Sequence, residues 1–248
     1  GGRFLERPLK DLAGMDEDRR EALLLHLHSK EYAIGHGCAA TWDPGHQSPG
    51  LIRAEFLPHA DVLPLEAPED RTSPLVVSRF AQADGQAGDN SDASMLTLLQ
   101  EIPQRYAQWV EQIAATRLAQ VPDDFTRDAD RQLARCRRSC ERIMAGIEEL
   151  RTKPQAMEAF RMANSAMVEV LRRSDWERKH GAGGRVYDPA LAKPVDECRW
   201  RPFQLAFVLQ CLSSITKPES EDRKVCDLLW FPTGGGKTEA YLLLTAFV

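Results

Sequence analysis

The chain has 248 residues and a net charge of -5, with 43% hydrophobic and 28% charged residues, a composition typical of a globular protein rather than a disordered or fibrous one. The acidic balance gives no global attraction to nucleic acid or to an anionic membrane, so such binding would need a local basic patch. No apolar run approaches the roughly 18 residues of a membrane span, and the polar start GGRFLERPLKDL does not resemble a signal peptide. We therefore expect a cytoplasmic protein without a membrane partner.

The N-terminal part of the chain predicts a small mixed α/β region. Acidic residues followed by good helix formers predict a helix over residues 16–29. Residues 31–43 and 51–57 are rich in β-branched and aromatic residues or alternate apolar with charged ones, which predicts an antiparallel pair of strands. Residues 75–80 are a further strand candidate, and the stretch 84–92, rich in Gly, Asp and Ser, predicts a mobile loop.

The pattern then changes to helical spacing. Apolar residues fall roughly on one stripe of a helix, namely Leu96, Leu99, Tyr106, Trp109, Val110, Ile113 and Leu118. The first turn of a helix tolerates the missing N–H of proline, so Pro103, Pro122 and Pro154 predict helix starts. The predicted helices cover residues 103–120, 122–150 and 154–173.

A boundary follows, because glycine and proline concentrate in residues 180–197 and disfavour regular structure. Beyond it, residues 200–215 predict an amphipathic helix, 226–231 a short buried strand, and the residues from Glu239 a second helix, with a glycine-rich loop between strand and helix. This order is typical of the start of an α/β nucleotide-binding domain. The predicted organisation is an α+β region (1–93), a helical bundle region (94–179), a linker (180–199) and the incomplete first part of a RecA-like P-loop domain (200–248).

The loop between that strand and helix has the chemistry of a phosphate site. Gly234, Gly235 and Gly236 lack a Cβ, so the backbone can adopt positive φ angles and bring its N–H groups close to a polyphosphate at a helix N-terminus. Lys237 would reach the β and γ oxygens, and the Thr238 hydroxyl would bind Mg²⁺. We expect ATP and Mg²⁺ as cofactors, with Lys237 and Thr238 catalytic. The alternative is a glycine-rich turn whose lysine faces solvent.

The general pattern G-x-x-x-x-G-K-[ST] is only partly met, because Phe231 stands at its first glycine. Superfamily 2 helicases relax that position and read P-T-G-x-G-K-T, which residues 232–238 resemble at every fixed place. They also carry an Arg-Pro-x-Gln segment, matched by residues 201–204, whose Gln reads adenine; the alternative is an ordinary helix start with a surface Gln. The predicted nucleotide-binding residues are Arg201, Gln204, Pro232, Thr233, Gly234, Gly235, Gly236, Lys237, Thr238 and Glu239.

Four blocks, WRPFQLAFVL, LLWFPTGGGKTEAYL, AFRMANSAM (159–167) and YAIGHGCAATW (32–42), resemble the helicase subunit of the DISARM anti-phage system. The resemblance implies an ATP-dependent DNA helicase or translocase that works with a partner subunit and a DNA methyltransferase to restrict phage. The chain stops soon after the glycine loop, before the acidic pair and the arginine that hydrolysis needs, so we expect this polypeptide alone not to hydrolyse ATP. The runner-up is a non-hydrolysing interaction module with a structural loop. A P-loop kinase or GTPase is disfavoured by Phe231.

Other residues have weaker claims to chemistry. His36 and Cys38 lack a third orienting group, so a strand or turn role is favoured over catalysis. Cys136 and Cys140 share a helical face, yet two thiolates rarely make a zinc site, and reduced thiols are expected for all six cysteines.

Two further groups could contact nucleic acid. A basic stretch on a predicted helix could follow a phosphate backbone, although interspersed glutamates favour a solvated face with ion pairs; it comprises Arg135, Arg137, Arg138, Arg142, Arg151 and Lys153. Trp176, Trp200 and Tyr187 could stack on bases, although such aromatic residues more often lie in a core.

Overall fold

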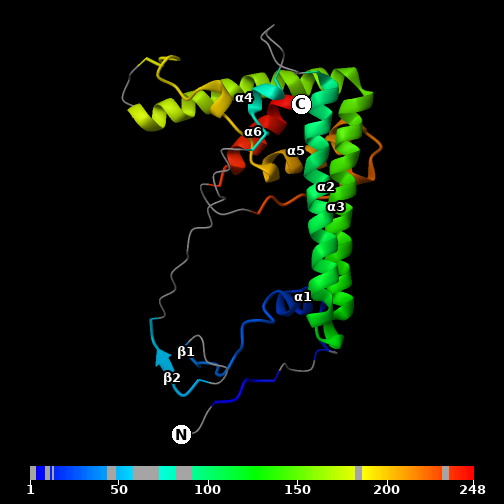
Figure 1. Ribbon diagram of the computed structural model, residues 1–248. Coiled ribbons are helices and arrows are strands. Elements are labelled where there is room, and N and C mark those ends of the chain that lie inside the picture. Colours follow the sequence, from blue (N-terminus) through cyan, green and yellow to red (C-terminus); the bar gives the residue numbers. More distant parts are fainter. Residues whose placement is uncertain are drawn as a thin grey trace. The chain divides into compact units, whose positions relative to one another are not determined.

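The computed structural model describes residues 4–8, 12, 14–43, 49–57, 73–81, 91–181, 186–230 and 235–248. These residues are mostly helical and carry one two-stranded sheet (Figure 1). The helices are α1 (Glu17–Leu25), α2 (Asp92–Arg117), α3 (Thr126–Thr152), α4 (Pro154–His180), α5 (Pro202–Thr216) and α6 (Lys237–Phe247), and the strands are β1 (Ala39–Trp42) and β2 (Ile52–Glu55). Short 3-10 helices are η1 (Val77–Arg79), η2 (Leu118–Gln120), η3 (Asp123–Phe125), η4 (Val195–Glu197) and η5 (Glu221–Lys224). The predicted α+β character is consistent with this arrangement, and a RecA-like sheet is not seen among the described residues.

The chain packs as two units. Unit 1 contains residues 1–64 and 113–134, and unit 2 contains residues 65–112 and 135–248. The predicted domain limits at residues 93, 179 and 199 remain predictions.

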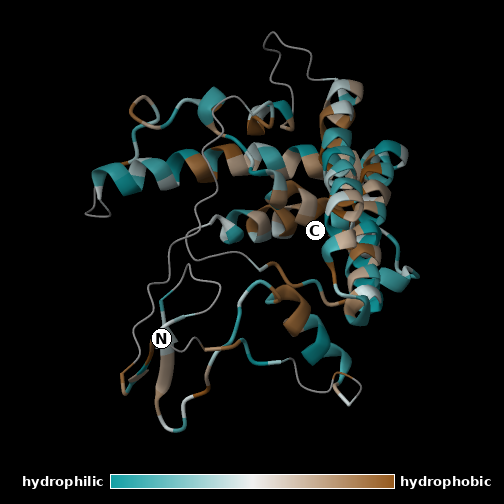
Figure 2. Ribbon diagram, turned by 60° about the horizontal axis from the view of Figure 1, so that its bottom comes forward, coloured by the Kyte–Doolittle hydropathy of each residue, from teal (hydrophilic) through white to brown (hydrophobic). Residues whose placement is uncertain are grey.

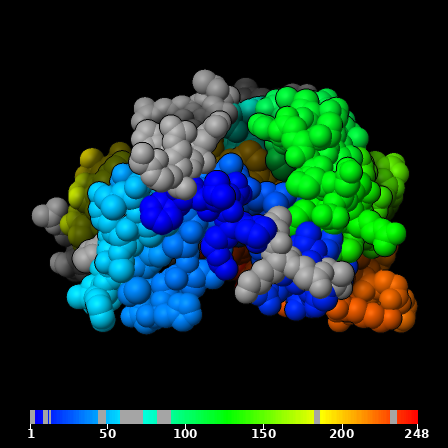
Figure 3. Space-filling model, turned by 90° about the horizontal axis from the view of Figure 1, so that it is seen from below, coloured from blue at the N-terminus to red at the C-terminus, as the bar shows by residue number. Residues whose placement is uncertain are grey.

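Unit 1 contains the predicted first helix and the predicted hairpin. The side chain of Asp16 accepts a hydrogen bond from the Arg19 N–H at 2.8 Å and caps α1, as its acidic start predicted. β1 and β2 pair antiparallel at the surface of the unit (light blue to cyan in Figure 3), with Trp42 opposite Ile52. Helix α1 is joined to α3 by Arg20, whose Nη2 lies 2.6 Å from Oδ2 of the buried Asp128. Hydrogen bonding from Arg20 lowers the pKa of Asp128.

Unit 2 holds the main core. Helices α2 and α3 lie side by side (Figure 1) and are joined by a bidentate contact between Arg137 and Glu111. Helix α6 packs against both α4 and α5. Hydropathy varies along α4 between hydrophilic and hydrophobic residues (Figure 2), as expected for a helix with one buried face. The most deeply buried large side chains of the unit include Phe80, Leu99, Phe160, Trp200, Leu205, Leu209 and Leu243.

A close approach of two helices depends on a glycine. A Cβ built at Gly146 of α3 would lie 1.8 Å from the carbonyl oxygen of Leu209 in α5. The backbones of α3 and α5 therefore touch at a point where only glycine fits.

Two predictions for segments of unit 2 are wrong. Residues 75–80 do not form a strand: Val76 makes a single bridge with Arg199, and residues 77–79 form η1. A 3-10 turn places residues three apart on one side, which buries both Val77 and Phe80. Pro103 does not open a helix but lies inside α2, which begins at Asp92.

The reason for the second error is tertiary packing. Met95, Leu98, Leu99 and Ile102 precede Pro103 and are buried in the core of unit 2. Their burial stabilises the helical turn ahead of the proline and offsets the loss of one backbone hydrogen bond. Of the predicted loop over 84–92, residues 84–90 lie outside the described residues. Pro154, by contrast, stands in the first turn of α4 as predicted.

Packed structure reaches both ends of the predicted linker (180–199), whose limits remain predictions. Helix α4 extends to His180, beyond the predicted 173, and Cys198 and Trp200 are packed into the core. The N–H of Trp200 donates to the carbonyl of Leu75, and the N–H of Val77 donates to the carbonyl of Cys198. These hydrogen bonds join the end of the predicted linker to η1.

The predicted strand over 226–231 is wrong for residues 226–230, which the structure describes. They have no regular secondary structure and form no ladder, and Leu228 and Trp230 are 85% and 76% exposed. A strand exists only when a neighbour satisfies its N–H and C=O groups, and no described residue of unit 2 provides one. In the described residues no helix is both long enough and apolar enough to cross a membrane.

Candidate functional site

The predicted helix after the glycine loop is confirmed. Helix α6 begins at Lys237, and its N-cap is Gly236 with φ 86° and ψ 28°. This left-handed conformation is open to glycine and strained for residues with a Cβ. Gly235, the residue before it, is buried. Pro232, Thr233 and Gly234 lie outside the described residues.

The first turn of α5 binds the carbonyl groups of this glycine turn. Arg201 donates from Nη1 to the Gly235 oxygen at 2.6 Å, and Gln204 donates from Nε2 to the Gly236 oxygen at 2.7 Å. The Oε1 atom of Gln204 accepts from the Arg201 N–H at 2.8 Å. Because one partner is a donor and the other an acceptor, this network fixes which amide atom of Gln204 is nitrogen. The structure thus brings together four of the predicted nucleotide-binding residues.

These two contacts also orient the backbone N–H groups of the turn. In a planar trans peptide the C=O and the following N–H point in opposite directions. The carbonyls of Gly235 and Gly236 face Arg201 and Gln204, so the N–H groups of Gly236 and Lys237 are directed away from them. A Cβ at Gly236 would lie 2.6 Å from Nε2 of Gln204, so this close contact also requires glycine.

The next three predicted residues occupy the first turn of α6. Lys237 is half-buried, Thr238 is exposed, and Glu239 is the acidic residue of that turn. Oε2 of Glu239 would lie 3.3 Å from a Cβ at Gly236, so its carboxylate lies beside the glycine turn. An exposed hydroxyl at the second helical position fits the predicted role of Thr238 as a ligand to nucleotide-bound Mg²⁺.

The sequence reasoning missed a group of charged residues around the segment that precedes the loop. Arg142 of α3 donates to both carboxylate oxygens of Asp227, at 2.5 Å and 2.7 Å. Its Nε lies 3.3 Å from Oδ2 of Asp222. The side chain of Arg142 is only 6% exposed. Arg142 was visible in the sequence as part of a basic stretch, but nothing local paired it with Asp227.

The rest of that basic stretch is also largely ion-paired, as the glutamates indicated. Four of its members lie near carboxylates on α2, α3 or η5: Arg137 with Glu111, Arg138 with Asp222, Arg151 with Glu148, and Lys153 with Glu149. Paired guanidinium groups are less available to a phosphate backbone, so the interpretation as an ion-paired helix face is favoured.

The tryptophans predicted as core residues are buried. Trp200 donates from Nε1 to Oδ1 of the buried Asn164 at 2.8 Å. Trp176 is stacked on His180 with ring centroids 5.1 Å apart and meets Tyr187 edge-on at 5.8 Å. Neither tryptophan presents a free face for a base.

The GHGC segment is a turn. A Cβ at Gly35 would lie 2.0 Å from the carbonyl oxygen of Cys38, so this glycine permits a tight backbone contact. His36 is exposed and Cys38 half-buried. All six cysteines are free thiols. Across the described ranges no group of three or more His, Cys, Asp and Glu side chains could hold a metal ion.

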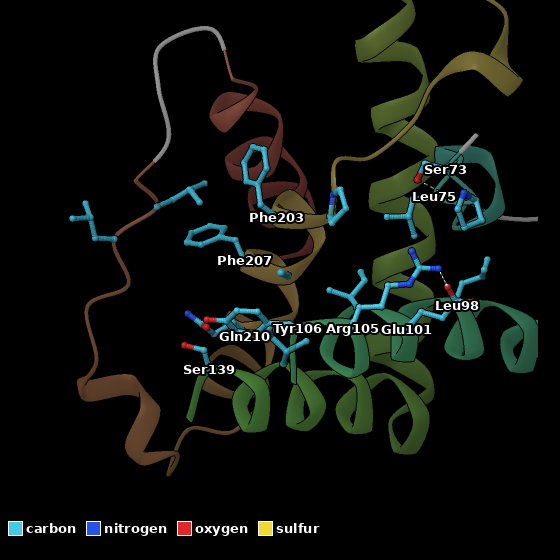
Figure 4. A pocket seen from close by; sticks show the side chains of 17 residues that line it. Ser73, Leu75, Leu98, Glu101, Arg105, Tyr106, Ser139, Phe203, Phe207 and Gln210 are labelled. Atoms are coloured by element: carbon cyan, nitrogen blue, oxygen red, sulfur yellow. Dashed lines mark hydrogen bonds and ion pairs between the residues drawn. The ribbon is translucent and has the colours of Figure 1, made fainter. Parts of the chain in front are cut away.

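A cavity of about 670 Å³ lies beside α5, within the size range of small-molecule sites. Phe203 and Phe207 project toward it from α5, and the ion pair of Arg105 with Glu101 lies opposite on α2 (Figure 4). Leu228 and Leu229, which precede the loop, also line it. No sequence pattern predicted this cavity, because its walls come from five segments distant in the chain.

Comparison with known proteins supports the resemblance. No protein-family model matches the chain. Over 235 residues the chain is 29% identical to the DISARM protein DrmA of Bacillus paralicheniformis. The match covers 90% of this chain and 20% of DrmA, so the chain spans about one fifth of the length of that relative. Across this stretch the chain is similar to DrmA, as its resemblance to the DISARM system predicted.

Proposed function

We propose that residues 201–239 are the ATP-binding portion of a superfamily 2 DNA helicase or translocase that acts in a DISARM-like anti-phage system. The observation that carries this proposal is the left-handed turn at Gly236, held by Arg201 and Gln204 at the start of α6. The similarity to a DISARM protein supports the biological setting. DNA, a partner subunit and a DNA methyltransferase are the proposed partners of the whole protein.

The proposed roles follow from the chemistry of each group. The N–H groups of Gly236 and Lys237, directed away from α5, would donate to phosphate oxygens at the positive end of the α6 dipole. The Lys237 ammonium would contact the β and γ phosphates, and the Thr238 hydroxyl would bind Mg²⁺. The magnesium ion would neutralise phosphate charge when nucleotide is bound.

Gln204 keeps capacity for adenine. Each of its amide atoms has one partner in the structure, and an amide can make up to two hydrogen bonds at oxygen and two at nitrogen. The remaining N–H of the Gln204 amide could donate to adenine N7, and the remaining lone pair of its oxygen could accept from the adenine N6 amino group. The side chain is only 4% exposed, so adenine would have to reach it at the edge of the glycine turn.

Thermal unfolding with and without Mg-ATP tests the proposal. A ligand that binds only the folded state at 100 times its Kd stabilises it by about 2.7 kcal/mol, which for this size corresponds to a rise in Tm of roughly 5–10 °C. We expect Lys237→Ala and Thr238→Ala to lose most of the shift. Lys224→Ala is the matched control, because Lys224 is exposed and pairs with Glu221 within η5. An identical shift in Lys237→Ala and in the parent would refute the assignment of the site.

The alternative is an interaction module in which the loop is purely structural. The contacts of Arg201 and Gln204 with the loop carbonyls are compatible with this alternative, because they would stabilise the turn equally well if it bound no ligand. This alternative predicts no change in Tm with Mg-ATP at millimolar concentration, with unchanged Tm values for Thr238→Ala.

A further inference from the structure

The segment that enters the glycine loop has few backbone contacts. Its only backbone hydrogen bond to a described residue runs from the Val225 N–H to the Asp222 carbonyl, at 3.1 Å. Side chains alternate along it: Asp227 and Leu229 are half-buried, while Leu228 and Trp230 are exposed. Since no ladder holds residues 226–230 in the described structure, side-chain contacts must fix their position.

The strongest of these contacts is a clamp centred on Arg142, defined here as Arg142, Asp222 and Asp227. The guanidinium of Arg142 bridges both oxygens of Asp227 and contacts Asp222. Gln210 of α5 donates from Nε2 to Oδ1 of Asp227 at 2.8 Å. The clamp therefore ties one short segment to two helices, α3 and α5.

Burial makes this clamp different from the other ion pairs of α3. Bidentate contacts between a guanidinium and a carboxylate are about twice as strong as neutral hydrogen bonds, and burial reduces their screening. Arg142 is 6% exposed, whereas Arg151, on the same helix and paired with Glu148, is 57% exposed. A buried cation without its partner is strongly disfavoured, so Arg142 and Asp227 hold each other in place.

We propose that Arg142 is a positioning residue for the phosphate-binding loop, because it fixes the segment that leads into the loop while Arg201 and Gln204 fix the glycines that leave it. This inference rests on the proposed nucleotide-binding function. The loop would then be held on both sides by helical side chains. On one side α3 and α5 hold Asp227, and on the other the start of α5 holds Gly235 and Gly236. Loss of the first anchor would leave the N–H groups of the loop less well oriented for phosphate.

Cys211 supplies a readout of the clamp that does not involve nucleotide. It lies on α5 with Sγ 3.9 Å from Oδ2 of Asp227 and is buried. Burial raises the pKa of Cys211 to about 12, and the charge of Asp227 acts in the same direction, while Arg142 opposes it. If Arg142 were removed and nothing moved, the thiol would become less reactive. If the segment detached, the thiol would become exposed and more reactive. The sign of the change therefore separates electrostatics from detachment.

The first measurement is the rate of alkylation of each cysteine at pH 8, followed by mass spectrometry, in the parent, Arg142→Met, Arg142→Lys and Arg151→Met. We expect Cys211 to react about tenfold faster in Arg142→Met, in line with local opening of a surface segment. Arg142→Lys should show a smaller increase, because lysine keeps the charge but cannot bridge both oxygens. Arg151→Met should match the parent. Cys198, buried elsewhere in unit 2, reports global unfolding and should stay protected throughout.

The second measurement is the affinity for Mg-ATP of the same variants. The inference predicts that Arg142→Met binds several-fold more weakly, that Arg142→Lys is intermediate, and that Arg151→Met is unchanged. An unchanged or slower reaction of Cys211 in Arg142→Met would overturn the clamp. Faster reaction with unchanged affinity would overturn the positioning role. If Arg142→Met exposes Cys198 as well, Arg142→Lys decides by the same two criteria. If the parent does not bind Mg-ATP, the proposed function is refuted, and the positioning role with it. The alkylation rates would still decide whether the clamp exists.

Discussion

Replacement of Gly146 by alanine should destabilise the protein, although the same change usually stabilises a helix. In an exposed helix interior, alanine is about 1 kcal/mol more favourable than glycine. At Gly146 the added Cβ would lie 1.8 Å from the Leu209 oxygen and 2.7 Å from its carbonyl carbon. A relaxed carbon–oxygen contact is about 3.3–3.6 Å, so α3 and α5 would have to separate by roughly 1.5 Å.

That separation disturbs the core of unit 2. Ile143, Ile147 and Leu209 are all buried around the contact, and dispersion falls steeply over such a gap. Overpacking of a core typically costs about 1–3 kcal/mol, and here the clashing atom is backbone rather than a flexible side chain. After subtraction of the helix-propensity gain of about 1 kcal/mol, we expect Gly146→Ala to lose on the order of 1–2 kcal/mol.

The assay is urea unfolding followed by far-UV circular dichroism and tryptophan fluorescence. Met144, on the same helix and 52% exposed, provides the control: Met144→Ala should be more stable than Met144→Gly by about 1 kcal/mol. The order of alanine and glycine is thus expected to reverse between positions 144 and 146. If Gly146→Ala is as stable as the parent or more stable, α3 and α5 do not approach as described and the reasoning fails.

Two further predictions concern buried polar groups. Burial alone would raise the pKa of Glu149, but hydrogen bonds from Lys153, Lys217 and Thr216 hold it at about 2, against an ordinary value of 4.5. The contribution of ionised Glu149 to folding stability is therefore present above pH 4.5 and lost as the pH falls toward 2. Glu149→Gln should cost up to about 3 kcal/mol of unfolding free energy at pH 7, and the difference in urea midpoint from the parent should shrink between pH 5 and 3. A difference in midpoint that does not depend on pH would contradict this. Trp200→Phe should cost about 1–3 kcal/mol because it leaves the Asn164 oxygen without a donor, and Asn164→Leu in the same chain should recover part of the loss, as a double-mutant cycle would show.

Local patterns in the sequence predicted the elements whose causes are local. Three helices begin where the sequence predicted a start. The signals are the acidic residues at the start of α1, the proline at the start of α4 and the Arg-Pro at the start of α5. The helix start at Pro103 and the strand over residues 226–230, the described part of 226–231, were mispredicted because tertiary contacts decide them. A buried apolar stripe continues α2 through its proline, and residues 226–230 have no strand partner among the described residues.

The same division holds for the candidate site. The glycine turn and the helix that starts at Lys237 follow from seven adjacent residues, and the Arg201–Gln204 segment from four, so both were visible in the sequence. Arg142 and Asp227 are 85 residues apart, and no periodicity joins them. The contact of Gly146 with Leu209 is equally invisible, since a helical glycine reads only as a weak helix former until the partner helix is known.

Three residues of α3 contact α5 or share a partner with it, and their spacing along α3 explains why they can all do so. Arg142, Gly146 and Glu149 stand at positions i, i+4 and i+7, which lie on one face of a helix. Arg142 shares Asp227 with Gln210 of α5, Gly146 touches Leu209, and Glu149 binds Thr216 at the end of α5. One face of α3 is thus tied to residues 209–216 of α5 by three different means: charge, close backbone contact and a buried hydrogen bond. Because α5 carries Gln204 at its other end, we expect the position of the glycine turn to depend on α3 through α5, so a change on this face of α3 should weaken the proposed nucleotide binding without a direct contact.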